Sequence, residues 1–169
     1  NKKGAYVINP QFDGAYSFGS NGLAAVKKSG KWGFIDKNGK FKIEAQFDSA
    51  ENFSNGLALV KLGEQYGYID QSGKFAINPQ FDKAFSFADN GRTVVCVESK
   101  YGIIDKKGAY IVNPIYSTAT KFFADNYAFT TNENGTLSLI DTNGKVLASF
   151  SGYDLDPLLT LLASLIAYG

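Results

Sequence analysis

The sequence predicts an all-β fold made of tandem repeats of about 35 residues, and three observations predict it. A motif of the type aromatic-Gly-x-Ile-Asp recurs at steps of 34, 35 and 36 residues. Each copy is followed by a glycine-containing turn and a segment of alternating apolar and polar residues. Glycine (18 residues) and aromatic residues (15 %) are plentiful while charged residues make up 20 %, which suits short strands joined by tight turns.

The repeated motif sets the period of the array. Its copies read Trp32-Gly33-Phe34-Ile35-Asp36, Tyr66-Gly67-Tyr68-Ile69-Asp70, Tyr101-Gly102-Ile103-Ile104-Asp105 and, more weakly, Leu137-Ser138-Leu139-Ile140-Asp141. Self-similarity at a fixed period is the signature of a repeat architecture. Each motif is therefore expected to be one strand of a repeating sheet.

The turn and the strand after each motif follow from local chemistry. In the first copy Asp36 opens the turn and Gly39 closes it, which suits a type I turn followed by a left-handed residue. The next segment places Phe41, Ile43, Ala45 and Phe47 on one face and polar residues on the other, as expected of a half-buried strand. Asn-Pro pairs at 9/10, 78/79 and 113/114 should end regular pairing or lie on an edge.

Loop lengths group the strands into units. A third strand precedes each motif, as in Leu23-Ala24-Ala25-Val26, and a short loop joins the two, whereas about nine residues separate one unit from the next. The prediction is an array of three-stranded antiparallel meanders over residues 1–154, in an open solenoid-like arrangement; a small β-propeller is the alternative. The meanders are expected at about 22–47, 56–81, 91–116 and 127–153, with a partial leading repeat at 4–12.

These motifs resemble the bacterial WG repeat, also called the KWG repeat. The resemblance is carried by Lys31-Trp32-Gly33-Phe34-Ile35-Asp36, by Pro10-Gln11-Phe12-Asp13 and by the Gly-Leu-Ala-x-Val segments, over residues 4 to about 154. It implies a tandem array without enzymatic activity, in an envelope or secreted protein. Two copies depart from the pattern, with Leu137-Ser138 in the fourth and Ile115-Tyr116-Ser117 in the third, so the C-terminal units are expected to pack less regularly or to act as a cap.

The C-terminal segment 155–169 is expected to form an apolar helix. Asp156 suits the N-cap and Pro157 the first helical position, and the segment is too short to span a bilayer. The helix either caps the array or docks into a groove on another chain. In the second case the partner-binding residues are Leu158, Leu161, Leu162, Leu165 and Ile166.

The composition argues against catalysis and against nucleic acid as a partner. There is no histidine, which removes the commonest general base and transition-metal ligand, and Cys96 is the only cysteine. The repeated aspartates are expected to hold turns, so no catalytic residue, metal or cofactor is predicted. A net charge of +1 without a basic cluster does not suit a phosphate backbone.

The function predicted is therefore a non-catalytic protein-interaction or scaffold module of a bacterial envelope or secreted assembly, although a cytoplasmic location stays open. The alternative is a cell-surface carbohydrate-binding module. In-register aromatics are expected in the core, whereas four out-of-register ones are candidates for stacking on a ligand. They are Tyr16, Phe85, Tyr127 and Phe129.

Overall fold

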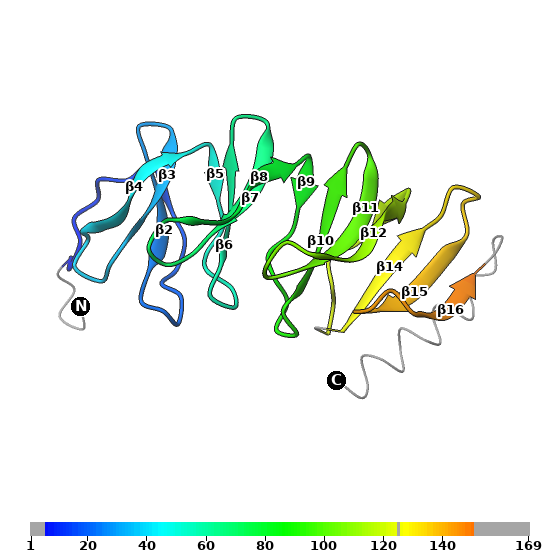
Figure 1. Ribbon diagram of the computed structural model, residues 1–169. Coiled ribbons are helices and arrows are strands. Elements are labelled where there is room, and N and C mark those ends of the chain that lie inside the picture. The colour runs from blue at the N-terminus through cyan, green and yellow to red at the C-terminus, as the bar shows by residue number, and fades with distance from the viewer. Residues whose placement is uncertain (1–5, 125, 151–169) are drawn as a thin grey trace. The chain divides into compact units, whose positions relative to one another are not determined.

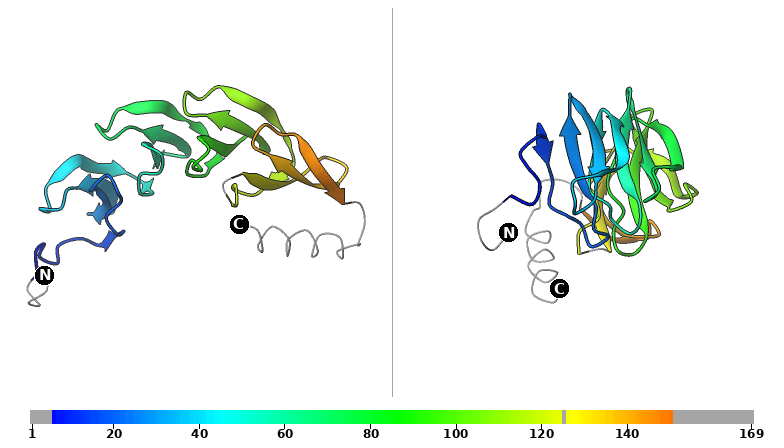
Figure 2. Two further views of the ribbon diagram at one scale, coloured as in Figure 1. Left: turned by 90° about the horizontal axis from the view of Figure 1, so that it is seen from below. Right: turned by 90° about the vertical axis from the view of Figure 1, so that its left-hand side faces the viewer.

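The structure is a computed structural model, which describes residues 6–124 and 126–150. The chain divides into two compact units, Asn1–Phe81 and Asp82–Gly169. The described residues contain strands and no helix, which confirms the all-β prediction. Each unit holds two sheets, drawn in Figure 1 and from two further sides in Figure 2. The predicted C-terminal helix, residues 155–169, lies outside the described residues.

The first unit contains a first sheet and a second sheet. The first sheet consists of β1 (Gly14–Ala15), β2 (Ala24–Lys28), β3 (Lys31–Ile35) and β4 (Phe41–Phe47). The second consists of β5 (Ser49–Ala50), β6 (Ala58–Leu62), β7 (Gln65–Ile69) and β8 (Phe75–Phe81). All pairings are antiparallel, and neighbours in the sheet are neighbours in the chain.

The second unit repeats this topology in a third sheet and a fourth sheet. The third sheet consists of β9 (Lys83–Ala84), β10 (Arg92–Val97), β11 (Lys100–Asp105) and β12 (Tyr110–Tyr116). The fourth consists of β13 (Thr118–Ala119), β14 (Tyr127–Thr131), β15 (Leu137–Asp141) and β16 (Val146–Phe150).

The predicted three-stranded meander is corrected to a four-stranded one. The extra strand is short and comes from the start of the segment that was expected to be a plain connector: Ser49 and Ala50, for example, pair with Lys61 and Val60. A two-residue strand carries too little alternation to be seen in a sequence, since period-2 patterns need at least four residues. A four-stranded meander is the topology of a β-propeller blade, so at the level of the single sheet the propeller alternative fits.

Each sheet buries two faces because residues alternate along its central strands. In the first sheet Ala24, Val26 and Ile35 share what we call the upstream face, and Ala25 and Phe34, paired across β2 and β3, share the downstream face. The isoleucine of the motif is buried in every copy, at 3 % exposure for Ile35 and 0 % for Ile69, Ile104 and Ile140. The motif strand is therefore one of the two central strands of each sheet.

The core of the first unit lies between its two sheets. The downstream face of the first sheet packs there on the upstream face of the second, which presents Ala58, Val60 and Ile69. The side chain of Asn52 also links the two sheets, because its Oδ1 accepts from the Ala25 N–H at 3.1 Å and its Nδ2 donates to the Ser17 carbonyl at 2.7 Å. In the second unit, Val94 and Ile103 pack in the same way on Ala128 and Ile140.

The motif glycine is explained by the strand beside it. In the first three sheets the register of β4, β8 and β12 shifts twice, first opposite the motif glycine and again before the motif isoleucine. The bulged strand crosses so closely that a Cβ on Gly33 would lie 2.6 Å from the Ile43 carbonyl oxygen and 2.7 Å from the Ala45 nitrogen. Only glycine fits without moving the backbone.

Candidate functional site

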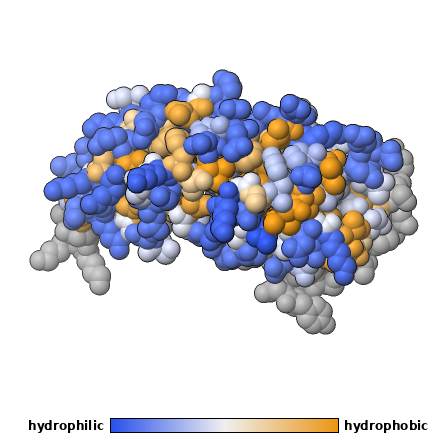
Figure 3. All heavy atoms as spheres, in the orientation of Figure 1, coloured by the Kyte–Doolittle hydropathy of each residue, from blue (hydrophilic) through white to orange (hydrophobic). Residues whose placement is uncertain are grey.

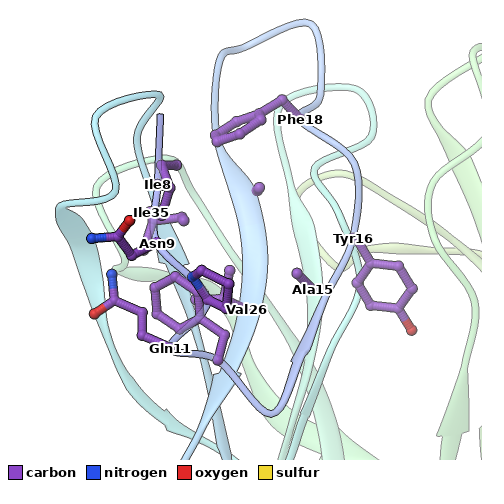
Figure 4. Close-up of a pocket in the computed structure, with 11 residues that line it drawn as sticks. Ile8, Asn9, Gln11, Ala15, Tyr16, Phe18, Val26 and Ile35 are labelled. Carbon is purple, nitrogen blue, oxygen red and sulfur yellow. The ribbon is translucent and has the colours of Figure 1, made fainter. Parts of the chain in front are cut away.

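An apolar pocket of about 270 Å³ opens in the first unit, on the upstream face of the first sheet (Figure 4). Its walls come from the segment before β1, from β1, and from the central strands β2 and β3. Figure 4 shows the amides of Asn9 and Gln11 on one side and Phe18 and Tyr16 on others. The lining residues are Ile8, Asn9, Pro10, Gln11, Phe12, Ala15, Tyr16, Phe18, Ala24, Val26 and Ile35.

The pocket exists because only part of the upstream face is covered. Ala24, Val26 and Ile35 form a buried cluster, and Ile8 and Phe12 pack against it from the segment before β1. The ring of Phe12 meets that of Phe41 edge-on, with centroids 5.9 Å apart. Two other lining residues are less covered: Phe18 is 41 % exposed and Tyr16 is 50 % exposed. Phe18 thus offers a partly exposed ring at this place, whereas the side chain of Tyr16 points away from the other lining residues (Figure 4).

Tyr16, one of the four predicted stacking residues, lies at this pocket. Its ring stacks on that of Trp32, with centroids 5.2 Å apart and planes 24° apart. The stack holds the tyrosine ring in place, while Figure 4 shows the hydroxyl pointing away from the other lining residues. An exposed ring held in this way can offer its face to an apolar or sugar ligand at little cost in side-chain entropy.

The other three candidates lie in the second unit. Phe85 is half-buried against the core between the third and fourth sheets. Tyr127 and Phe129 are half-buried on β14 and meet a ring that the sequence did not single out, Phe123: the Phe123–Phe129 centroids are 5.3 Å apart and the Phe123–Tyr127 centroids 6.2 Å. The structure therefore brings Tyr127 and Phe129 into one aromatic cluster, and it places Phe85 against the core of the unit.

The repeated aspartates hold turns. The Oδ1 atom of Asp70 accepts from the N–H groups of Ser72 at 2.8 Å and Lys74 at 3.1 Å, and from the Ser72 hydroxyl at 2.6 Å. Asp36, Asp105 and Asp141 accept two backbone N–H groups in the same positions.

These contacts lower the pKa of three of the carboxyl groups. The Lys40 N–H lowers the pKa of Asp36, the Ser72 hydroxyl lowers that of Asp70, and the Ala109 N–H lowers that of Asp105. A lowered pKa suits a structural carboxylate rather than a general acid. Among the described residues, no group of three or more Cys, Asp or Glu side chains is arranged to hold a metal ion.

A second set of aspartates accepts hydrogen bonds from the turns that join the second and third strands of the sheets. Asp48 accepts from the Gly63 N–H at 2.8 Å, and Asp82 accepts from the Glu98 N–H at 2.7 Å. Asp48 also pairs with the Lys31 ammonium, and this hydrogen bond is the main cause of the lowered pKa of its carboxyl. These are the aspartates of the Gln-Phe-Asp and equivalent segments, so their recurrence in the sequence reflects turn geometry.

The single cysteine is buried in β10, and burial raises the pKa of its thiol. A buried thiol with a raised pKa is a poor nucleophile. The predicted helix residues Leu158, Leu161, Leu162, Leu165 and Ile166 lie outside the described residues. Within the described part of the chain, no helix has the length and apolar character needed to cross a membrane.

The pocket was missed in the sequence, although one signal pointed to it. Residues 6–12, the described part of the partial leading repeat, form no strand and cover only part of the upstream face of the first sheet, whereas the second sheet has a whole sheet against that face. The sequence indicated the partial repeat but did not indicate that a pocket opens beside it. Elsewhere, apolar side chains reach the surface of both units, as Figure 3 shows on one face.

Comparison with protein families identifies the repeat. The family described as "WG containing repeat" matches four consecutive segments, residues 1–32, 32–66, 66–101 and 101–135. No curated protein matches the chain at a significant level.

Several solved structures share the fold at low sequence identity. Hsv2p of Kluyveromyces lactis superposes with a TM-score of 0.59 at 13 % identity over 84 % of this chain and 51 % of its own. BamB of Moraxella catarrhalis gives 0.50 at 16 % identity over 76 % and 46 %, and a eukaryotic initiation factor gives 0.56 at 11 % identity over 88 % and 46 %. This chain thus spans about half the length of each. Hsv2p and BamB are propeller-like, which agrees with the four-stranded blades.

Proposed function

We propose that this chain, which belongs to the WG-repeat family, is a non-catalytic module that binds a partner protein and helps to hold a larger assembly together. The observation that carries the proposal is the pocket of the first unit, which is apolar and has Tyr16 and Phe18 about half exposed at its walls. Protein interfaces are built around apolar pockets that receive anchoring side chains, with polar groups at the rim. Asn9 and Gln11 supply such groups here.

The absence of catalysis is part of the same proposal. The carboxylates that recur in the repeats are engaged by backbone N–H groups of their own turns, the one thiol is buried, and the sequence contains no histidine. A bacterial envelope or secreted location also belongs to the proposal and rests on the family resemblance. Fractionation of the source cells checks the location.

A photoreactive side chain at the pocket tests partner binding. Phe18 replaced by benzoyl-phenylalanine should crosslink one protein of the source cells at high yield, because Phe18 lines the pocket and is 41 % exposed. The same residue in place of Lys42, exposed on β4 and outside the pocket, is the matched control. Equal products at both positions, or none at either, would contradict the proposal.

Carbohydrate binding is the second candidate, and the Tyr16–Trp32 stack is the observation that favours it. Sugar rings pack on exposed aromatic faces, and the amides of Asn9 and Gln11 are near enough to the same pocket to bind hydroxyl groups. Glycan binding that is lost with Tyr16→Ala, but kept with Phe129→Ala, would support this function at this place. Glycan binding lost with Phe129→Ala would instead assign it to the cluster in the second unit.

A further inference from the structure

An exposed isoleucine in the second unit has no explanation in the packing of the repeats. Glutamine precedes the last aromatic residue of the leading segment, of β4 and of β8, as Gln11, Gln46 and Gln80, and all three are exposed. The same position of β12 is Ile115, whose residue surface is 56 % exposed. Because the other copies form their sheets with glutamine here, the sheet does not need an apolar side chain at this position.

The hairpin between the second and third strands of the fourth sheet also departs from the repeat. The corresponding hairpins have two residues between their strands, as in Ser29-Gly30, whereas residues 132–136 separate β14 from β15. Asn132 orders this longer loop, because its Oδ1 atom accepts from the N–H groups of Asn134 and Thr136, both at 3.0 Å. The backbone of the loop tip is therefore held in a defined turn.

An ion pair of the second unit is rearranged at the same place. In the first unit Lys31 pairs with Asp48, which lies just before the first strand of the next sheet. The corresponding residues of the second unit are Lys100 and Ser117, so the carboxylate partner is lost. The Lys100 ammonium pairs instead with Glu133 on the longer loop, at 2.6 Å. The side chain of Glu133 nevertheless stays 75 % exposed.

These departures meet at one hollow of about 490 Å³ on the second unit. Pro114 and Ile115 give the hollow an aliphatic surface, and the Lys100–Glu133 pair gives it two charges that offset each other. Two amide side chains complete the lining, those of Asn132 and Asn134. The volume falls within the range of about 300–1,000 Å³ that is typical of small-molecule sites.

The chemistry of the lining decides which class of ligand it suits. The Glu133 carboxylate repels a phosphate or another anion, and the Lys100 ammonium repels a cation. A purely apolar ligand would cover the polar side chains without giving them hydrogen-bond partners, which costs free energy. A neutral ligand with many hydroxyl groups meets neither obstacle.

A sugar ring matches these groups in particular. Each hydroxyl group both donates and accepts, so neighbouring hydroxyls can accept from an ammonium or amide N–H and donate to the oxygen beside it. The Lys100–Glu133 pair offers a donor and an acceptor side by side, and the amide of Asn134 offers both as well. The C–H groups of the ring can then pack on Pro114 and Ile115.

We propose that this hollow of the second unit is a binding site for a neutral carbohydrate. Lys100, Glu133 and Asn134 bind its hydroxyl groups, and Ile115 supplies the surface on which the sugar ring lies. The inference goes beyond the proposed binding of a partner protein, which does not depend on it. The site is also separate from the pocket of the first unit, since the two share no lining residue.

NMR titration of the full chain tests the proposal. The probes are cellotriose, maltotriose, mannotriose and triacetylchitotriose, each added to millimolar concentration. At least one of them should shift the backbone amide resonances of residues 132–135 and the methyl resonances of Ile115. If none of the four sugars shifts these resonances, the carbohydrate site is ruled out.

Two pairs of variants locate the binding. Ile115→Gln restores the residue of the other copies and should weaken sugar binding about fivefold or more, because the aliphatic surface is lost. Ile111→Gln is its matched control, since Ile111 is exposed on the same strand outside the lining. Asn134→Ala should also weaken binding, whereas Asn143→Ala, exposed in the turn after β15 and outside the lining, should not. Unchanged binding in Ile115→Gln would overturn the assignment to this hollow.

Further measurements separate this site from the other candidates. Tighter binding of trigalacturonic acid or of inorganic phosphate than of any neutral sugar would overturn the ligand class. Sugar binding that is lost with Tyr16→Ala or Phe129→Ala, and kept with Ile115→Gln, would place the carbohydrate elsewhere on the chain. If crosslinking at position 18 captures a partner protein while no sugar binds, only this inference fails and the proposed function stands.

Discussion

The first three sheets and the fourth sheet share one topology but differ in how the outer strand pairs with the motif strand. In the first three, the outer strand has seven residues and its register shifts opposite the motif glycine as well as before the motif isoleucine. In the fourth, β16 has five residues and pairs without a shift from Leu137 to Leu139, as in Ser138 opposite Ser149. The motif glycine thus belongs with the bulge, and Ser138 is allowed where the bulge is missing.

This comparison revises the expectation attached to the weak fourth motif. Leu137-Ser138 was expected to accompany less regular packing, yet the pairing at this point is more regular than in the other copies. The hydroxyl groups of Ser138 and Ser149 lie 3.0 Å apart and hydrogen-bond across the strands. Loss of the glycine here reflects a shorter outer strand rather than a weaker sheet.

The largest effect is expected from a methyl group on a bulge glycine. Gly67→Ala places a Cβ 2.7 Å from the Ile77 carbonyl oxygen and from the Pro79 nitrogen, so the backbone of β8 must move. Overpacking of this kind costs on the order of 1–3 kcal/mol, and the collision with backbone places Gly67→Ala at the upper end. Denaturant unfolding of the two chains measures the loss.

The fourth sheet supplies the control for this change. Ser138→Ala should cost far less than Gly67→Ala, because it removes only an exposed hydroxyl pair with Ser149. Deleting Asn78 and Pro79 from the Gly67→Ala chain should recover part of the lost stability, because β8 would then pair with β7 as β16 pairs with β15. Equal losses at positions 67 and 138, or no recovery, would show that the bulge does not explain the glycine.

The sequence was sufficient to predict some features of the fold and not others. Burial of Ile35, Ile69 and Ile104 followed from the repeat, since an apolar residue that recurs at one fixed position of each motif strand is expected to face the core in every copy. The bulge was not predicted: the sequence alternates from Phe41 to Phe47 as if these residues shared one face, but the register shifts place Phe41 against the upstream cluster and Ile43 and Phe47 in the downstream core. The Asn-Pro pairs marked the irregular edge but not its size.

The candidate site was predictable only in part, for a similar reason. Tyr16 was singled out because it is out of register with the aromatics expected in the core, and it is one of the residues that line the pocket. The remaining wall residues looked like ordinary core positions, and they are core positions at the internal interface of the unit. Phe18 and Ala15 are pocket residues because no sheet among the described residues packs on this face, which is a property of the packing and not of any residue.

A smaller effect is expected in the turns, where the four sheets do not differ. Asp70→Ala and Asp141→Ala each remove a carboxylate that accepts two backbone N–H groups of the turn that follows. Both should destabilise the chain less than Gly67→Ala and by similar amounts, measured by the same unfolding experiment. A clearly smaller loss at position 141 would mean that the fourth sheet departs from the others in its turn as well as in its outer strand.

The smallest effect is the dependence of stability on acid. The carboxyl groups of Asp36, Asp70 and Asp105 have lowered pKa values in the folded chain, so the folded state binds fewer protons than the unfolded state near their ordinary pKa of about 3.9. Their contribution is therefore present above about pH 4 and is lost as the pH falls through the lower folded values. Unfolding curves measured from about pH 6 to about pH 3, a range that includes the ordinary pKa of the carboxyl group, should show this loss. Asp70→Asn should flatten the curve slightly, because the amide keeps an acceptor oxygen in the turn but does not titrate.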